Sequence, residues 1–135
     1  MLNANWFKPG VHITAVGSHR PTLPKLRPNV FQQADLIVVD DLAQCNVFGE
    51  VQHGLAANTI NMENIHGELG NLVHGTISGR TDANQITLAD LIGLDAMDTV
   101  VITLVLEKAL FFGLGQRIEI GLGQERIGQQ IQTLL

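Results

Sequence analysis

His19 is the residue of this sequence whose type and position best suit chemistry. It follows an apolar run that ends at Gly17, and it stands beside Arg20 in a proline-rich stretch. In parallel α/β sheets the ligand crevice lies beyond the carboxyl ends of the strands, and an imidazole can transfer protons near neutral pH. We therefore treat His19 as a candidate acid or base, with an ordinary surface histidine as the alternative.

The remaining histidines do not form a metal-binding pattern. His66 and His74 stand eight positions apart, whereas ligands on one helical face are spaced by three, four or seven, and no HExxH motif occurs. The sequence therefore predicts no metal site. His12 falls inside a predicted strand, where a packed or edge position is expected. Cys45 is the single cysteine, which excludes a disulfide within the chain and favours a reducing compartment.

Three charged residues are weaker candidates for a functional role. Glu50 follows a glycine at the predicted start of a helix, where the helix dipole favours a carboxylate, and that structural role is sufficient. Glu68 is expected to be solvated or to cap a helix. Arg80, after Gly79, suits either an anion or a plain surface charge, and we favour the surface charge.

Composition limits the classes of protein that the chain can represent. It has 135 residues, 45% of them hydrophobic, which predicts one domain, or part of one, with a real core. The net charge of −5 and the 4% of aromatic residues argue against a surface for nucleic acid or for an anionic membrane. No leader is visible, and the apolar run near 100–106 is too short to span a membrane. We expect a soluble, cytoplasmic protein without nucleic-acid or membrane partners.

Apolar runs alternate with helical patterns along the chain. The apolar run at 36–39 lies between two aspartates, which is typical of a strand buried on both faces of a parallel sheet. The pattern predicts strands at 11–17, 36–39 and 86–89, and helices at 29–34, 49–57, 65–73 and 95–112. The alternation indicates an α/β protein with a parallel sheet and flanking helices.

Two features suggest that the predicted fold needs a partner. Three strands make a small sheet, although burial on two faces requires neighbours. The long predicted helix at 95–112 is apolar nearly all round, and a helix of that kind must be covered on most sides. The chain therefore looks like half of a larger fold.

Several segments, taken in order, resemble the C-terminal part of the ornithine cyclodeaminase/mu-crystallin family. The matching segments are residues 6–17, 34–40, 49–51, 68–69 with Val73 and Gly75, 79–81, and 86–93 with Asp98. The first of these segments is the most specific. Together they cover most of residues 6–115.

The resemblance implies a fold and a class of activity. Residues 1–94 would be the C-terminal half of a Rossmann-type domain that binds NAD or NADP, residues 95–113 a long C-terminal helix returning toward a dimerisation domain, and residues 114–135 a tail. The family acts on small amino acids or their cyclic imines, as cyclodeaminases, amino-acid dehydrogenases or ketimine reductases. Expected partners are a second copy of the chain, in a homo-oligomer, or the missing N-terminal half, which in the family carries the dinucleotide glycine loop.

The resemblance also assigns site residues. His19 stands at the position of the family's catalytic Asp. The positions that contact the cofactor are Ala15, Val16, Gly17, Ser18, Leu23 and Leu91. This sequence departs from the family's pattern at some of these positions. Leu23 replaces a lysine, Lys25 a glutamate and Leu91 a serine.

Three hypotheses follow for the chain by itself. It is a C-terminal fragment of an NAD(P)-linked amino-acid enzyme, inactive alone; it is a non-catalytic oligomerisation or interaction module derived from that fold; or it is a small working enzyme with His19 as its acid or base. We rank them in that order.

Overall fold

The computed structural model of the protein describes residues 1–17 and 23–118. The chain divides into two units, Met1–Asp98 and Thr99–Leu135. The first unit contains a β-sheet, and most of helix α4 (Asp95–Phe111) belongs to the second unit. Among the described residues, no helix combines the length and the hydropathy that a membrane span requires.

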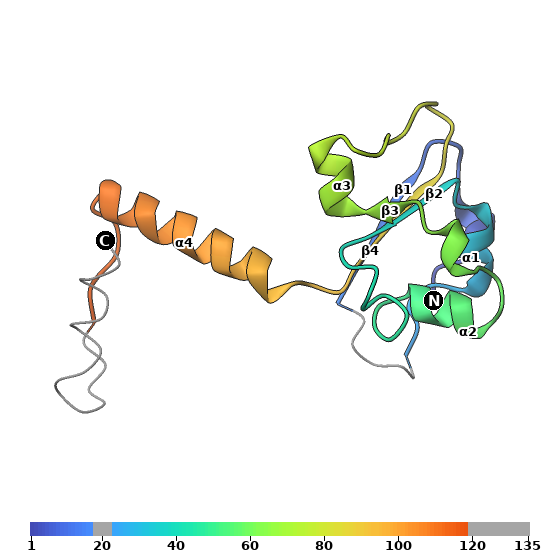
Figure 1. Cartoon of the computed structure of the whole chain (residues 1–135), viewed down its shortest axis with the longest axis horizontal. Helices are drawn as coiled ribbons and strands as arrows, with labels where there is room; N and C mark the ends of the chain where they lie inside the picture. The colour runs from blue at the N-terminus through green and yellow to red at the C-terminus, as the bar shows by residue number, and fades with distance from the viewer. Residues whose placement is uncertain (18–22, 119–135) are drawn as a thin grey trace. The chain divides into compact units, whose positions relative to one another are not determined.

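The first unit is built on a four-stranded parallel sheet (Figure 1). Its strands are β1 (His12–Val16), β2 (Leu36–Val39), β3 (Gly67–Glu68) and β4 (Thr87–Leu91), in the order β1-β4-β2-β3. All three neighbouring pairs are parallel. The predicted parallel sheet is confirmed, with one strand more than the three that the sequence pattern predicts.

The additional strand corrects the predicted helix at 65–73. The His66 backbone N–H donates to the Ile37 carbonyl oxygen at 2.7 Å, and this bond draws the following residues alongside β2. Gly67 adopts φ +151°, and a Cβ there would lie 2.8 Å from the Ile77 side chain. Glycine therefore allows an extended backbone where the helical pattern suggested continuity. Helix α3 begins only after this strand, at Leu69, and ends at His74.

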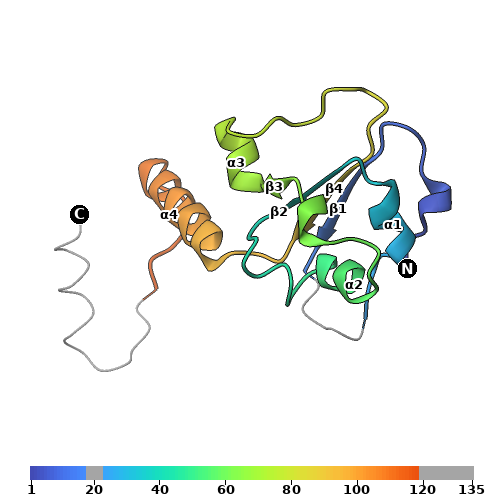
Figure 2. The same cartoon turned by 45° about the vertical axis from the view of Figure 1, so that its right-hand side comes forward.

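Short helices cover the sheet on one side. They are η1 (Ala4–Trp6), α1 (Pro28–Gln33), α2 (Val51–Ala56) and η2 (Met62–Asn64). Figures 1 and 2 place α1 and α2 on one side of the sheet and α3 on the other. The buried core lies between the sheet and the first group. Its members are Ala4, Ile13, Ala15, Leu26, Val30, Phe31, Ile37, Val39, Cys45, Val51, Ile60, Ile65 and Leu88.

The strands differ in how completely they are covered. In β2, Ile37, Val38 and Val39 are all buried, as expected for a strand with both faces covered. In β1 the pattern alternates, so that Ile13 and Ala15 are buried while His12, Thr14 and Val16 are exposed. His12 was expected at a packed or an edge position, and it lies at an edge, since β1 is at the end of the described sheet.

Helix α4 closely matches the predicted helix at 95–112. Asp95 and Asp98 stand in its first turn and Lys108 in its last, which agrees with the direction of the helix dipole. No residue of α4 is buried. Its exposed large apolar side chains, each at least half exposed, are Met97, Val100, Val101, Ile102, Leu104, Val105, Leu106, Leu110 and Phe111.

Candidate functional site

The carboxyl edge of the sheet is where parallel strands most often bind a ligand. Here β1 ends at Val16, and Gly17 follows in the left-handed conformation at φ +69°. The Gly17 N–H donates to the Leu91 carbonyl oxygen at 3.0 Å, which fixes the exit of β1 against the end of β4. The Lys25 Nζ donates to the Val16 carbonyl oxygen.

The structure brings together several of the predicted cofactor-contacting residues. Val16 pairs with Leu91 across the β1–β4 ladder, and Gly17 follows directly. Val16 is exposed and Leu91 half-buried, whereas the Ala15 side chain is buried in the core and leaves only its backbone near the edge. These roles stay predictions.

The other predicted residues are not part of that group. Leu23 is 61% exposed in the loop before α1. Ser18 and the predicted catalytic residue His19 lie outside the described residues. Their roles also stay predictions.

Buried carboxylates form the structural centre of this edge, and from the sequence Asp90 was not expected there, while Glu50 was expected to have a structural role only. Asp90, near the end of β4, is 2% exposed, and Glu50, the residue before α2, is 0% exposed. The Asp90 Oδ2 accepts the N–H groups of Glu50 at 2.6 Å and Val51 at 2.7 Å. It therefore satisfies two of the donors that a helix start leaves free.

Glu50 differs from the role expected for it. Its side chain does not cap α2. Instead its carboxylate reaches the segment before α1 and accepts the Lys25 N–H at 2.9 Å and the Leu26 N–H at 2.9 Å, both on Oε2. The expected position at the helix start is confirmed, and the hydrogen bonds of the carboxylate hold a distant backbone segment.

Burial changes the acidity of Asp90. Desolvation raises the pKa of this carboxyl to about 6, since a charge is disfavoured away from water. The N–H groups of Val51 and Glu50 act in the opposite direction, and the nearby Glu50 and Asp40 carboxylates add to the increase. The Asp90 carboxyl therefore has a pKa close to neutral pH.

Gly49 makes the contact with Asp90 possible. It adopts φ +81°, and a Cβ at this position would lie 2.5 Å from the Asp90 Oδ2 and 2.9 Å from the Ile92 side chain. Glycine supplies both the left-handed backbone and the room for the carboxylate.

Two further carboxylates extend the cluster along the edge. Asp40, directly after β2, accepts the Gly93 N–H on Oδ2 at 2.7 Å. Its Oδ1 is buried and has no hydrogen-bond partner within the described part of the chain. Glu68, expected to be solvated or to cap a helix, instead accepts the Leu42 N–H at 3.0 Å. The carboxylates at this edge thus act as acceptors for loop backbone.

Cys45 lies close to this cluster but is not suited to nucleophilic chemistry. The thiol is 1% exposed and donates to the Leu42 carbonyl oxygen at 3.3 Å. Burial, followed by the Asp90 and Asp41 charges, raises the pKa of the Cys45 thiol. A thiol with a raised pKa is a poor nucleophile, because the reactive species is the thiolate.

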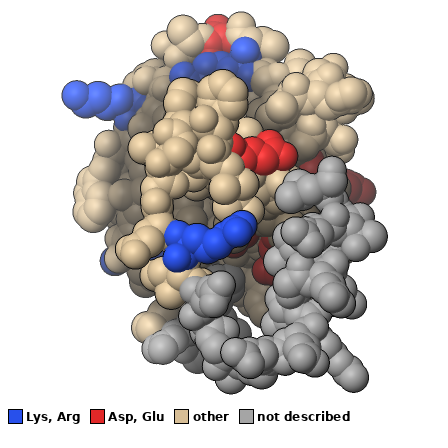
Figure 3. All heavy atoms as spheres, turned by 90° about the vertical axis from the view of Figure 1, so that its left-hand side faces the viewer, with Lys and Arg blue, Asp and Glu red and all other residues tan. Residues whose placement is uncertain are grey.

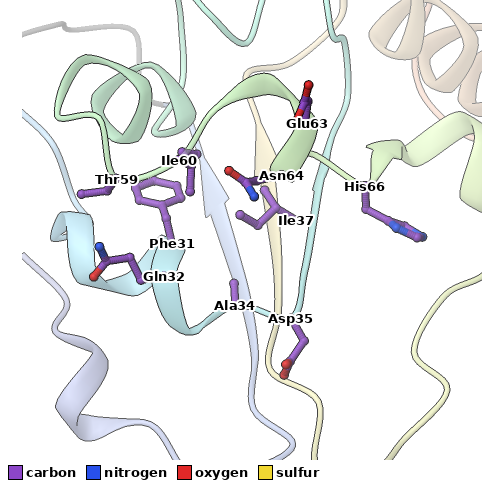
Figure 4. A pocket seen from close by; sticks show the side chains of 10 residues that line it. All are labelled: Phe31, Gln32, Ala34, Asp35, Ile37, Thr59, Ile60, Glu63, Asn64 and His66. Carbon is purple, nitrogen blue, oxygen red and sulfur yellow. The ribbon is translucent and has the colours of Figure 1, made fainter.

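One cavity lies at the opposite, amino edge of the sheet. It encloses about 540 Å³ beside α1 and η2. In Figure 4, Phe31, Ile37 and Ile60 form its apolar side, while Asp35 and Glu63 lie at its two ends. The His66 side chain points away from that apolar group, and its Nε2 bonds to the Ser78 carbonyl oxygen at 2.7 Å. The described residues contain no group of three or more His, Cys, Asp or Glu side chains that could hold a metal ion.

A second cavity of about 210 Å³ lies beside β1, β2 and β4. Its polar groups already bond to one another. The Arg80 Nη2 donates to the Thr87 Oγ1 at 3.0 Å, which stands 2.7 Å from the His12 Nδ1, and the His12 Nε2 is 3.1 Å from the Thr14 Oγ1. Arg80 also donates to the Gly10 carbonyl oxygen at 2.7 Å. Its guanidinium thus binds backbone and side-chain oxygens of the sheet.

The sequence around Asp90 contained a signal that this residue is buried and needs hydrogen-bond donors. Asp90 follows Leu88 by two positions, so both side chains point to the same face of β4, and Leu88 is wholly buried. An aspartate at an inward position of a buried strand must find donors. The partners themselves, Glu50 and Val51, are 40 and 39 residues away and could not be identified from spacing.

The fold and this edge define the class of protein. The structure is similar to the iminosuccinate reductase of Paracoccus denitrificans in complex with NAD⁺, with 34% identity, a TM-score of 0.75, and coverage of 89% of this chain and 36% of that one. It is also similar to the Thermococcus litoralis Δ¹-pyrroline-2-carboxylate reductase in complex with NADH and L-proline, with 27% identity, a TM-score of 0.78, and coverage of 87% and 36%. The parallel sheet is thus part of a Rossmann-type nucleotide-binding domain.

The sequence comparison specifies the family. The sequence profile of the ornithine cyclodeaminase/mu-crystallin family matches residues 1–111. The alanine dehydrogenase of Archaeoglobus fulgidus is 33% identical over 119 residues, which are 88% of this chain and 37% of that protein. The chain belongs to the ornithine cyclodeaminase/mu-crystallin family, as the resemblance predicted. It spans about a third of the length of the curated relatives that it matches.

Proposed function

We propose that this chain contributes the second half of the nucleotide-binding domain to an NAD(P)-linked enzyme that acts on small amino acids or cyclic imines, and that it is inactive alone. The observation that carries the proposal is the sheet itself, which is similar to that of reductases solved with NAD⁺ or NADH. In this family position, the carboxyl edge around Gly17 and Leu91 would face the nicotinamide.

Among the described residues β1 pairs on one side only, with β4, and this supports the need for a complementary polypeptide. The Thr87 N–H donates to the Val11 carbonyl oxygen at 3.1 Å, and the Gly17 N–H to the Leu91 carbonyl oxygen at 3.0 Å. The residues of β1 that bond to β4 are therefore the odd-numbered ones. Because backbone groups alternate in direction along a strand, the N–H and C=O groups of even-numbered residues such as Thr14 point away from β4. An edge of this kind is a template for another strand, and we propose that the complementary half pairs there.

Titration with NADH, followed by the fluorescence of bound nicotinamide, tests this function. We expect no micromolar NADH binding by the chain alone. We expect binding once the chain is mixed with a second polypeptide, the part of a family relative that precedes the region matched by this chain. Micromolar binding or turnover by the isolated chain would overturn the proposal. Loss of that turnover in His19→Ala would assign it to His19.

The variant Thr14→Pro tests whether the complementary half pairs with the edge of β1. Proline removes the outward N–H of Thr14 without removing a bond to β4, and edge strands tolerate it there. We expect the variant to fold but to lose the NADH binding that the complementary part restores. If binding is restored equally well, the two halves do not meet through β1.

A second candidate function, a non-catalytic module that associates with another copy, is favoured by one observation. The side chains of α4 are apolar around most of the helix, and Val101, Val105 and Phe111 are 58%, 61% and 84% exposed. Figure 3 shows one face of the molecule, on which the described surface is mostly uncharged, with separated acidic and basic groups. Large exposed apolar patches mark interfaces.

Sedimentation velocity distinguishes this candidate from the first. Association that increases with concentration and is lost in the double variant Val101→Glu, Val105→Glu would favour the module. The substitution Lys108→Glu on the same helix controls for charge alone. A chain that stays monomeric at high concentration would exclude pairing with itself.

A further inference from the structure

Two buried carboxylates are connected in series at the carboxyl edge. Asp90, fixed in β4, accepts the N–H groups of Glu50 and Val51, and the Glu50 carboxylate in turn accepts those of Lys25 and Leu26. The backbone of Glu50 is therefore a hydrogen-bond donor to one carboxylate, while its side chain is an acceptor for another segment. Three segments, β4, the start of α2 and the segment before α1, are joined by two side chains.

The segment that Glu50 holds, Lys25 with Leu26, belongs to the stretch between β1 and α1. On the opposite side it pairs with the N-terminus, where the Leu2 N–H donates to the Lys25 carbonyl oxygen at 2.7 Å and the Arg27 N–H to the Leu2 carbonyl oxygen at 3.0 Å. The preceding end of the stretch, Gly17, bonds to the carbonyl of Leu91, the neighbour of Asp90. Both flanks of the stretch thus depend on the same end of β4.

We propose that Asp90 and Glu50 are positioning residues, in which Asp90 sets the start of α2 and Glu50, placed in this way, sets the backbone of Lys25 and Leu26 beside the nucleotide edge. The inference rests on the proposed function for its purpose, because this is the edge expected to face the cofactor. Neither residue needs to touch substrate or cofactor for this role.

We call this series of hydrogen bonds, from Asp90 through Glu50 to Lys25 and Leu26, the relay. The charges around the relay make it sensitive to pH. The groups that face Asp90 are Glu50 from the start of α2, Asp40 from the end of β2, and the Cys45 thiol. The charges acting on Asp90 are both negative, those of Glu50 and Asp40, and burial adds to their effect. A proton added to Asp90 weakens it as an acceptor, so we expect the bonds to Glu50 and Val51 to loosen first.

Native-state amide hydrogen exchange tests the order of the relay. In Asp90→Asn we expect exchange at Glu50 and Val51 to increase at least tenfold relative to the Leu88 amide, and exchange at Lys25 and Leu26 to increase with it. In Glu50→Gln we expect the increase at Lys25 and Leu26 only. The matched control is Glu68→Gln, which should affect the Leu42 amide alone.

One outcome of the exchange experiment would contradict the relay. If Asp90→Asn leaves Lys25 and Leu26 protected, the two carboxylates act independently and the relay is wrong. A general loss of stability would change the Leu88 amide as much as the others and would not imitate the expected pattern.

A titration of the unmodified chain keeps the proposal testable if Asp90→Asn does not fold. We expect the amide shifts of Glu50 and Val51 to titrate near pH 6, and those of Lys25 and Leu26 to follow with the same midpoint. Shifts at Lys25 and Leu26 that do not follow would overturn the relay. Both measurements are independent of NADH binding, so failure of the proposed function leaves this result interpretable.

Discussion

The two edges of the sheet use the same hydrogen bond in different surroundings. At the amino edge, the exposed Asp35 accepts the Ile86 N–H on Oδ2 at 2.7 Å. At the carboxyl edge, the buried Asp90 accepts the Val51 N–H on Oδ2, also at 2.7 Å. The donor–acceptor distances of the two bonds are therefore equal, and the two aspartates differ in how deeply they are buried. Water can replace the first bond, whereas nothing replaces the second, so the two edges should respond very differently to substitution.

The largest expected effect is that of removing the buried carboxylate. Asp90→Ala leaves the Glu50 and Val51 N–H groups without an acceptor, and we expect the free energy of unfolding to fall by about 3 kcal/mol. Asp35→Ala removes the matched bond at the exposed edge and should lower it by less than about 1 kcal/mol. Urea denaturation of the two variants measures both values. Equal losses would show that burial does not distinguish the edges.

Crowding around Asp90 predicts the next largest effect. Gly49→Ala places a Cβ 2.5 Å from the Asp90 Oδ2 at φ +81°, and we expect a loss of about 2–3 kcal/mol. Gly75, after α3, has φ +82° but nothing within 4 Å of such a Cβ, so Gly75→Ala should lose only the conformational part, about 1 kcal/mol. Thermal denaturation gives the difference, which is the contribution of crowding. No difference would mean that the carboxylate moves aside freely.

A smaller effect is expected from pH. The pKa of Asp90 is about 6 in the folded chain and near 3.8 when exposed, so between these values the folded state binds a proton that the unfolded state does not. Relief of the buried charge outweighs the weakening of the hydrogen bonds from Val51 and Glu50. Stability from this group therefore rises as the pH falls, by about 1 kcal/mol from pH 7 to pH 5. Denaturation at both pH values, with Asp90→Asn as the reference, isolates this contribution. A slope that Asp90→Asn leaves unchanged would assign it to other groups.

The smallest effect is expected at the amino edge. Arg80 is exposed, and its bonds to Gly10, Val11 and Thr87 compete with water. We expect Arg80→Ala to lower the free energy of unfolding by less than about 1 kcal/mol, with Arg80→Lys as the control that keeps the charge. A loss as large as that of Asp90→Ala would remove the contrast between the two edges.

Much of the fold was predictable because its signals are local. The continuous apolar run at Leu36–Val39 identified a strand buried on both faces, and α4 was recognised by its length. The strand Gly67–Glu68 was not predictable, since two residues carry no periodicity and this pairing depends on the bond from His66 to Ile37. Tertiary pairing decided there against a helical pattern.

The candidate site divides in the same way. Gly17 and Leu91 were expected at the nucleotide edge from the resemblance, and the sheet brings them together. Glu50 was identified as a residue at a helix start, but its partners Lys25 and Leu26 lie 25 and 24 positions earlier in the sequence. Hydrogen bonds from a side chain to a remote backbone leave no periodic trace, so the relay became visible only in three dimensions.

The buried thiol of Cys45 can report local opening of this chain. Because the sequence has one cysteine and it is 1% exposed against the sheet, a thiol-specific dye can react only when the structure around it opens. The labelling rate in native buffer therefore measures how often the carboxylate-lined end of the domain opens, without any introduced probe.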